Sequence, residues 1–261
     1  PWDRARGSRS EWAKGLDVKQ FSDQSDILYY VGCTPAYDPR CQEAARALVN
    51  TFNASQVEYG TLVNEENCCG SSVYGMGEKG LFELLVEENT LLFEENAVEK
   101  LVTTSPHCYH TFKNRYGQID FQVQHYSEFL AGLIDSGKLQ FTRKTEKTVT
   151  YHDPCFLGRE NKIYDPPRKV LESIPGIKFV EMDRSRERSL CCEGGGGRMW
   201  IDVLGEKLAE KRVLDAVKNK AEVMVTACPF CLSTIEDAVL TSGHEGAIQV
   251  MDLIELVNQA L

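Results

Sequence analysis

This sequence of 261 residues lacks several features, and each absence argues against a kind of structure, cofactor or partner. No apolar run approaches the roughly 18–20 residues of a membrane-spanning helix, so no direct membrane span is expected. No glycine-rich signature of a nucleotide-binding loop is visible, so partner subunits, rather than a bound flavin or nicotinamide, are expected to supply the electrons for any redox reaction. The net charge of −10 argues against nucleic acid as the partner.

Cysteine, by contrast, is abundant. In a chain without a visible secretory signal, clustered cysteines bind metal more often than they form disulfides. We therefore expect a cytoplasmic protein that reaches the inner face of a membrane only through a partner. The ten cysteines are Cys33, Cys41, Cys68, Cys69, Cys108, Cys155, Cys191, Cys192, Cys228 and Cys231.

The chain contains an internal duplication. The blocks "NCCGSS", "LVTTSPHCYHTF" and "FQVQHYSEFL" are followed, in the same order, by "LCCEGG", "MVTACPFCLSTI" and "IQVMDLIELV". Matched blocks in one order indicate two similar halves. We place the first half at residues 26–143 and the second half at residues 144–261, after an N-terminal linker at residues 1–25.

Each half alternates β-rich and helical stretches. Strands are predicted at 26–32, 99–105, 147–152, 177–182 and 221–227, and the longer helices at 40–52, 78–96 and 199–219. This alternation predicts an α/β fold of two duplicated Rossmann-like domains, each a parallel sheet flanked by helices. Cys33, Cys155 and Cys228 each end a predicted strand, so the fold is expected to gather distant cysteines at one rim.

The second half has five cysteines in a pattern suited to metal. Adjacent cysteines can be two small buried residues or two ligands of one centre. A pair separated by two residues has the spacing of zinc and iron–sulfur sites. Five thiolates exceed what one tetrahedral zinc uses, whereas a multi-iron cluster can use them all. The five are Cys155, Cys191, Cys192, Cys228 and Cys231.

Four glycines, Gly194 to Gly197, follow the adjacent pair. They would let the backbone approach a cluster and direct amide N–H groups at its sulfur, or leave a side open to a substrate. A flexible loop is the alternative. His152 and Asp153, just before Cys155, are candidates to support the ligands through hydrogen bonds, or are structural.

The first half repeats the pattern with one ligand missing, because Ser105 stands where the second half has Cys228. This half could hold a second, smaller or altered iron–sulfur cluster, a zinc ion, or nothing. Its cysteines are Cys33, Cys68, Cys69 and Cys108, and the histidines that could supplement them are His107, His110 and His125. Cys41 has no counterpart in the repeat, and we expect it to be a packing residue.

The motifs "CCG", "YHDPCFLGR", "CCEGGGGRMW" and "TACPFC" resemble the cysteine-rich CCG-domain family, in particular the catalytic subunits of heterodisulfide reductase and related iron–sulfur oxidoreductases. The resemblance covers about Asp26 to Leu261. It implies a non-cubane [4Fe-4S] cluster on the five cysteines of the second half, with Gly194 and Gly195 beside it. It also implies Cys191 and Cys192 as reactive residues. Glu193 replaces the motif's glycine and is expected to add a catalytic carboxylate.

The resemblance also implies partners. Relatives exchange electrons with ferredoxin-like, flavoprotein or membrane cytochrome and quinone subunits, and a small disulfide or thiol is a further candidate substrate. Many carry a ferredoxin-like domain ahead of the repeats. No cysteine run of that kind occurs in this sequence, so residues 1–25 are expected to follow a missing domain and the chain to be a fragment or a separate subunit.

Three functions are therefore compared. The leading hypothesis is an electron-transfer oxidoreductase with its reactive cluster in the second half. The alternatives are an electron relay or docking subunit of a larger redox complex, and a structural module stabilised by zinc. An open cavity over Gly194–Gly197 would favour catalysis, and a sealed one would favour a relay.

Overall fold

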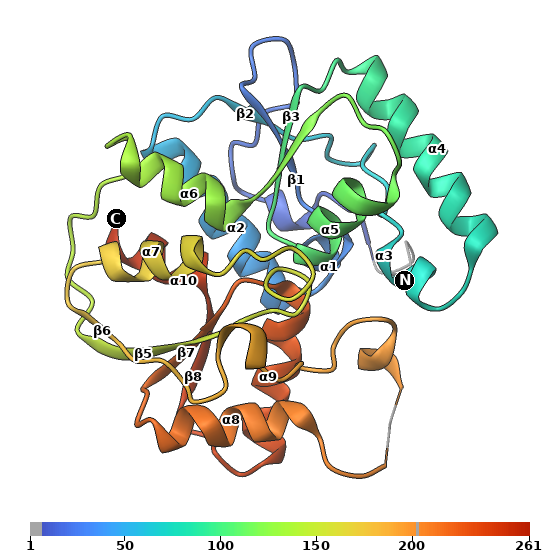
Figure 1. Ribbon diagram of the computed structural model, residues 1–261. Helices are drawn as coiled ribbons and strands as arrows, with labels where there is room; N and C mark the ends of the chain where they lie inside the picture. The colour runs from blue at the N-terminus through green and yellow to red at the C-terminus, as the bar shows by residue number, and fades with distance from the viewer. Residues whose placement is uncertain (1–6, 202–203) are drawn as a thin grey trace.

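The computed structural model describes residues 7–201 and 204–261, and it shows two halves built on one plan (Figure 1). Each half contains a four-stranded parallel sheet, ordered β2-β1-β3-β4 in the first half and β6-β5-β7-β8 in the second. The strands are β1 (Ile27–Tyr30), β2 (Tyr59–Gly60), β3 (Lys100–Thr103), β4 (Gln122–His125), β5 (Lys147–His152), β6 (Ile177–Phe179), β7 (Val223–Thr226) and β8 (Gln249–Asp252). The predicted fold class is confirmed.

The helices cover the two sheets. They are α1 (Cys33–Tyr37), α2 (Pro39–Ala54), α3 (Ser71–Gly75), α4 (Lys79–Glu95), α5 (Pro106–Arg115), α6 (Tyr126–Asp135), α7 (Asp165–Ser173), α8 (Leu208–Lys218), α9 (Pro229–Thr241) and α10 (Leu253–Ala260). Short 3₁₀ turns, η2 (Glu11–Ala13), η3 (Arg186–Arg188) and η4 (Arg198–Trp200), complete the described elements. Among the described helices, none is long and apolar enough to cross a membrane.

The central strands explain why parallel sheets form here. β1 has the sequence ILYY and β7 the sequence VMVT, and all four residues of each strand are buried. A strand that is apolar on both faces must be covered on both sides, which is the usual situation in a parallel sheet packed between helices. The carboxyl ends of the strands in each sheet then meet at one rim, where the cysteines follow.

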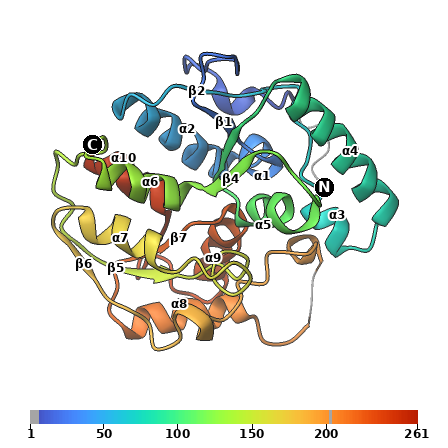
Figure 2. The ribbon, with the colours of Figure 1, turned by 45° about the horizontal axis from the view of Figure 1, so that its top comes forward.

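The two halves pack together through equivalent helices. α2 contacts α10, and α6 contacts α7 (Figure 2). Arg40 of the first half donates hydrogen bonds to Glu255 at 2.9 Å and to Glu236 at 2.9 Å in the second half. Tyr126 also reaches across, donating to Asp252 Oδ1 at 2.5 Å. The halves therefore share one continuous interface.

The prediction of a single helix over 199–219 is wrong. A 3₁₀ turn ends at Trp200, Ile201 has an extended backbone, and α8 begins only at Leu208. Gly205 has a φ of +110°, a conformation that interrupts a helix. Residues 202–203 of the predicted helix lie outside the described part of the chain.

The segment before β1 packs onto the first half. Trp12 is 1% exposed and its ring contacts Tyr29 edge-on at 6.0 Å. Arg9 forms a buried ion pair with Glu66. The first six residues of the predicted linker lie outside the described residues, and the limits of the linker and of the two halves stay a prediction.

Candidate metal centre

The five cysteines of the second half lie on three loops at one rim of its sheet. Cys155 follows β5, and Cys191 and Cys192 lie on the long loop after β6. Cys228 follows β7 as the N-cap residue of α9, and Cys231 lies in the first turn of that helix. Because the strands are parallel, all three loops leave the sheet at the same end.

The sulfur atoms approach one another closely. Cys155 Sγ lies 3.8 Å from Cys191 Sγ, and Cys192 Sγ lies 3.2 Å from Cys231 Sγ. Cys155 and Cys191 are half-buried, whereas Cys192, Cys228 and Cys231 are buried. The thiols therefore form one group with a protected side and a side nearer the solvent.

Two backbone N–H groups point at these sulfurs, and among the described residues Gly194 is the one of the four glycines that supplies such a donor. Glu193 N donates to Cys191 Sγ at 3.3 Å, and Gly194 N donates to Cys192 Sγ at 3.4 Å. A methyl group on Gly194 would lie 2.5 Å from Thr234 Oγ1, so only glycine fits there. Such donors stabilise negative charge on sulfur.

His152 lies among the buried thiols. One ring nitrogen of His152 and the sulfurs of Cys192 and Cys231 lie within 4.8 Å of one another. Arg212 Nε donates to His152 Nδ1 at 3.2 Å, which leaves the proton of the neutral ring on Nε2. Burial, and then the charge of Arg212, lower the pKa of His152 well below its usual value. His152 Nε2 is buried and has no partner within the described chain.

The thiols differ in acidity. Hydrogen bonds from Cys155 and Cys192 outweigh burial and lower the pKa of Cys191 to about 2. The same contact with Cys191, followed by burial, raises the pKa of Cys155. Burial raises the pKa of Cys228, but hydrogen bonds from Cys231 and His107 outweigh it and bring the value down to about 5. The lowered pKa values of Cys191 and Cys228 favour the thiolate, which is the form that binds a cation.

His107 is the residue of this site that the sequence placed elsewhere. It belongs to α5 of the first half and was expected only as a supplement to the first-half cysteines. In the structure it is 4% exposed and hydrogen-bonds to Cys228 of the second half. A single sequence carries no signal for such a contact between the halves.

Glu193 adopts the backbone of the glycine it replaces, with a φ of +66°. Its equivalent in the first half, Gly70, has a φ of +81°. The Glu193 carboxylate accepts hydrogen bonds from Arg198 Nη2 at 2.8 Å and from Leu208 N, at the start of α8, at 2.8 Å. The structure thus brings the backbone N–H of Glu193 to the thiols, and its catalytic role stays a prediction.

A cavity of about 230 Å³ opens beside the glycine loop. Cys192 and Glu193 line it together with side chains of α9 and the positively charged Arg198 and Lys207. Of the five cysteines, Cys192 lines this cavity, whereas none of Gly194 to Gly197 does.

The first half gathers its four cysteines in the same way. Cys33 Sγ lies 3.9 Å from Cys68 Sγ, and Cys69 is hydrogen-bonded with both Cys68 and Cys108. Ser105 Oγ accepts a hydrogen bond from Cys108 N at 3.4 Å and caps α5. Its cysteine counterpart at α9 makes no such cap.

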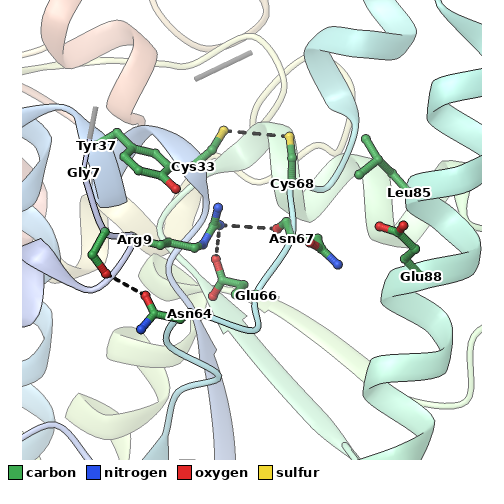
Figure 3. A pocket seen from close by; sticks show the side chains of 11 residues that line it. Gly7, Arg9, Cys33, Tyr37, Asn64, Glu66, Asn67, Cys68, Leu85 and Glu88 are labelled. Atoms are coloured by element: carbon green, nitrogen blue, oxygen red, sulfur yellow. Dashed lines mark hydrogen bonds and ion pairs between the residues drawn. The ribbon is translucent and has the colours of Figure 1, made fainter. Parts of the chain in front are cut away.

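Two cavities adjoin the first-half thiols. One, of about 10 Å³, lies among the four cysteines, Ser105 and His107. The other, of about 330 Å³, is lined by Cys33, Cys68 and the Arg9–Glu66 pair (Figure 3). Glu66 also accepts hydrogen bonds from the backbone N–H groups of Val31 at 2.9 Å and Gly32 at 2.8 Å, and so fixes the turn before Cys33.

The hydrogen bonds of Cys41 and of the other candidate histidines are made with groups other than the clustered thiols. Cys41 Sγ contacts Pro229 O at 3.4 Å and Ser233 Oγ at 3.3 Å, as expected of a buried packing residue. His110 Nδ1 lies 3.2 Å from Asn114 Nδ2, and His125 caps α6. Asp153, the other candidate support, forms a buried ion pair with Arg168 at 2.7 Å.

The fold and the site together define a class: a duplicated α/β protein with a multi-thiol centre at the rim of each sheet. Residues 27–113 and 149–236 both match the cysteine-rich domain family, CCG. The chain belongs to this family, which confirms the resemblance seen in the motifs.

Three curated proteins illustrate its relatives. Over 273 residues the chain is 35% identical to the probable iron–sulfur-binding oxidoreductase FadF of Bacillus subtilis, and over 278 residues 35% identical to the EtfAB:quinone oxidoreductase of Syntrophomonas wolfei. It is 34% identical over 270 residues to a subunit of the dihydromethanophenazine:CoB–CoM heterodisulfide reductase of Methanosarcina barkeri. Each match covers 100% of this chain, but only 39%, 39% and 64% of the three relatives.

Proposed function

We propose that this chain is part of an iron–sulfur electron-transfer oxidoreductase of the heterodisulfide reductase type. The observation that carries the proposal is the convergence of five thiols of the second half on one rim, with two backbone N–H groups directed at them. These five cysteines would hold a non-cubane [4Fe-4S] cluster. The names of the relatives, which include an iron–sulfur-binding oxidoreductase and a heterodisulfide reductase subunit, support this assignment.

The residues present fit such a group. His152 Nε2 is buried and has no partner in the described chain, and a ring nitrogen of His152 lies within 4.8 Å of the sulfurs of Cys192 and Cys231. A negatively charged sulfur cluster would satisfy it. Gly194 and its N–H provide a close backbone approach that a side chain would block. Five thiols also exceed the needs of one zinc ion.

The chain's own residues then have distinct roles. An iron–sulfur cluster held there supplies electron transfer. The backbone N–H groups of Glu193 and Gly194 stabilise negative charge on sulfur, which tunes the reduction potential. Cys191, on the more exposed side, and Cys192, which lines the 230 Å³ cavity, are the proposed reactive positions, with Glu193 at the cavity wall.

This cavity favours catalysis over a simple relay. A relay needs only proximity to its partners, whereas a reacting disulfide or quinone must reach the centre itself. The cavity lined by Cys192 supports such access, and its charged lining is mixed, with Arg198 and Lys207 accompanied by Glu193 and Asp237.

For the first half we propose no five-thiol cluster. Ser105 is used as a helix cap, and the cavity of about 10 Å³ among the four thiols is close to the size of a single water molecule. Four thiols rather than five favour a single zinc ion or no metal over a cluster like the one proposed for the second half.

The partners proposed are redox subunits. One relative is named as a quinone oxidoreductase acting with EtfAB and another as a heterodisulfide reductase subunit, so a flavoprotein, a quinone-linked subunit and a small disulfide are the candidates here.

The function is tested on anaerobically purified chain with a reduced viologen as electron donor. A small disulfide and a soluble quinone analogue serve as alternative acceptors. Turnover with either acceptor, lost in Cys191→Ala, supports catalysis at the second-half centre. Full turnover in Cys191→Ala removes the centre from the mechanism, and a chain that oxidises the donor once without turnover is a relay.

A further inference from the structure

His107 and Phe230 occupy equivalent positions in the duplication. The first half reads Ser105-Pro-His-Cys108 at the start of α5, and the second half reads Cys228-Pro-Phe-Cys231 at the start of α9. The two sequences differ at two positions: Ser105 stands where the second half has Cys228, and His107 stands where it has Phe230. The first half has lost a thiol, and it has a polar ring where the second half has an apolar one.

The two exchanged rings, His107 and Phe230, are in contact with each other. The His107 ring lies 4.5 Å from the Phe230 ring and 4.3 Å from the Phe156 ring, centroid to centroid. Both phenylalanines belong to the second half and each adjoins a proposed ligand cysteine in sequence. His107 is thus held between two side chains of the other half.

The glycine loop closes the same pocket. A methyl group on Gly195 would lie 2.6 Å from His107 Cε1, well inside the closest approach of carbon atoms. Gly195 has no positive φ, so its backbone does not demand glycine. Glycine is required at this position because a side chain would occupy the space of the His107 ring.

The polar edge of this ring reaches the second-half centre. His107 hydrogen-bonds to the sulfur of Cys228, the cysteine whose counterpart in the first half is Ser105. The loop amides of Glu193 and Gly194 donate to the adjacent pair of cysteines, Cys191 and Cys192, and neither is directed at Cys228. A side chain from the other half supplies the further donor.

We propose that His107 is a positioning residue for the second-half centre, and that the first half completes this centre by supplying a hydrogen bond to Cys228. The inference rests on the proposed cluster for its redox consequence, but the contact itself does not. A donor to a ligand sulfur stabilises the more negative, reduced state, so it raises the reduction potential.

The test compares His107→Phe with His107→Gln. Phenylalanine is the residue of the repeat at this position and keeps the stack, whereas glutamine keeps a donor. A control on the same helix is His110→Phe, because the His110 ring also contacts Phe156, edge-on at 4.9 Å, but hydrogen-bonds with asparagines. The iron content of each variant is measured first, and the midpoint potential is then measured by a redox titration followed by electron paramagnetic resonance.

For His107→Phe we expect unchanged iron and a reduction equilibrium shifted about tenfold against the reduced form. For a one-electron couple this corresponds to a midpoint about 59 mV lower. His107→Gln should recover most of the shift, and His110→Phe should show none. Gly195→Ala should shift the midpoint in the same direction by displacing the ring, while Gly132→Ala, which meets nothing within 4 Å, should not. Equal potentials in His107→Phe and wild type would overturn the inference while leaving the proposed cluster intact.

A second measurement does not depend on iron. In a Cys68→Ser/Cys69→Ser background, metal-free protein is titrated with Co²⁺ and binding is read from thiolate-to-cobalt absorption. His107→Phe removes a hydrogen bond to a ligand sulfur, so it should bind Co²⁺ about tenfold more weakly than His110→Phe. If wild type holds no iron, the proposed function fails, and equal Co²⁺ affinities would separately reject the role of His107.

Discussion

The rings of His107 and Phe230, equivalent residues of the two halves, stack on each other with their centroids 4.5 Å apart. The duplication therefore brings its own matched positions into contact. α2 of the first half is equivalent to α7 of the second, and α6 is equivalent to α10. The contact between α2 and α10 therefore repeats the contact between α7 and α6. The two halves act as one unit whose centre in the second half includes a residue of the first.

The cysteine ligands can be tested against a matched thiol. Cys228→Ser should lose most of the iron, because it removes a thiolate whose pKa is about 5 and which metal binding exploits. Cys41→Ser is the control, since Cys41 is buried against the same helix but keeps only contacts with Pro229 O and Ser233. Iron and acid-labile sulfide are measured in both. Equal losses would mean that general packing, rather than ligation, determines the iron content.

Ser105 offers a test by gain of function. Ser105→Cys restores the fifth thiol of the first half, whereas Ser105→Ala adds none. Both substitutions remove the N-cap of α5 and should destabilise the protein by about 1 kcal/mol, measured by urea unfolding of metal-free protein. Only Ser105→Cys should bind additional iron on reconstitution. The same iron content in the two variants would show that the first half is limited by something other than its ligand count.

His125 and Asp252 provide a pH test, since they are the equivalent N-caps of α6 and α10. Burial lowers the pKa of His125 to about 3 and raises the pKa of Asp252 to about 7. The contribution of the His125 pKa shift to the free energy of unfolding is present above the usual pKa of 6.5 and is lost as pH falls towards 3. That of Asp252 is present below its usual 3.8 and is lost as pH rises towards 7.

Between about pH 4 and 6.5 the two contributions therefore oppose each other in the wild type. Relative to wild type, His125→Asn should lose stability as pH rises through this window, and Asp252→Asn should gain it. Asparagine can cap a helix, so the caps remain in both variants. Urea unfolding at several pH values measures the slopes. Slopes in the two variants that both match wild type would contradict the opposing pKa shifts.

Much of the fold could be predicted because its signals are local. The strand 147–152 was predicted with the bounds that β5 has, and the apolar runs of β1 and β7 and the spacing of α2 and α4 are equally clear. The five-thiol group also followed from parallel topology, because loops at one rim must meet. The cap made by Ser105 had a local signal too, since a serine before proline at the first helical position is a common N-terminus.

The rest depends on contacts between the halves or on single residues. The prediction of one helix over 199–219 was wrong because the apolar spacing of this segment does not indicate the break at Gly205. The orientation of the Glu193 carboxylate towards Arg198 and α8 depends on where that helix begins. The position of His107 depends on how α5 meets α9 and the loop after β5, a packing arrangement that no sequence period encodes.

The central claim is that the second half holds one iron–sulfur cluster on five cysteines. The direct measurement is iron, zinc and acid-labile sulfide per chain on anaerobically purified protein, with electron paramagnetic resonance on the same sample after oxidation in the presence of a thiol. The account predicts about four iron and four sulfide per chain, and a paramagnetic signal that the thiol perturbs. Zinc without iron or labile sulfide would contradict it and make both thiol groups structural.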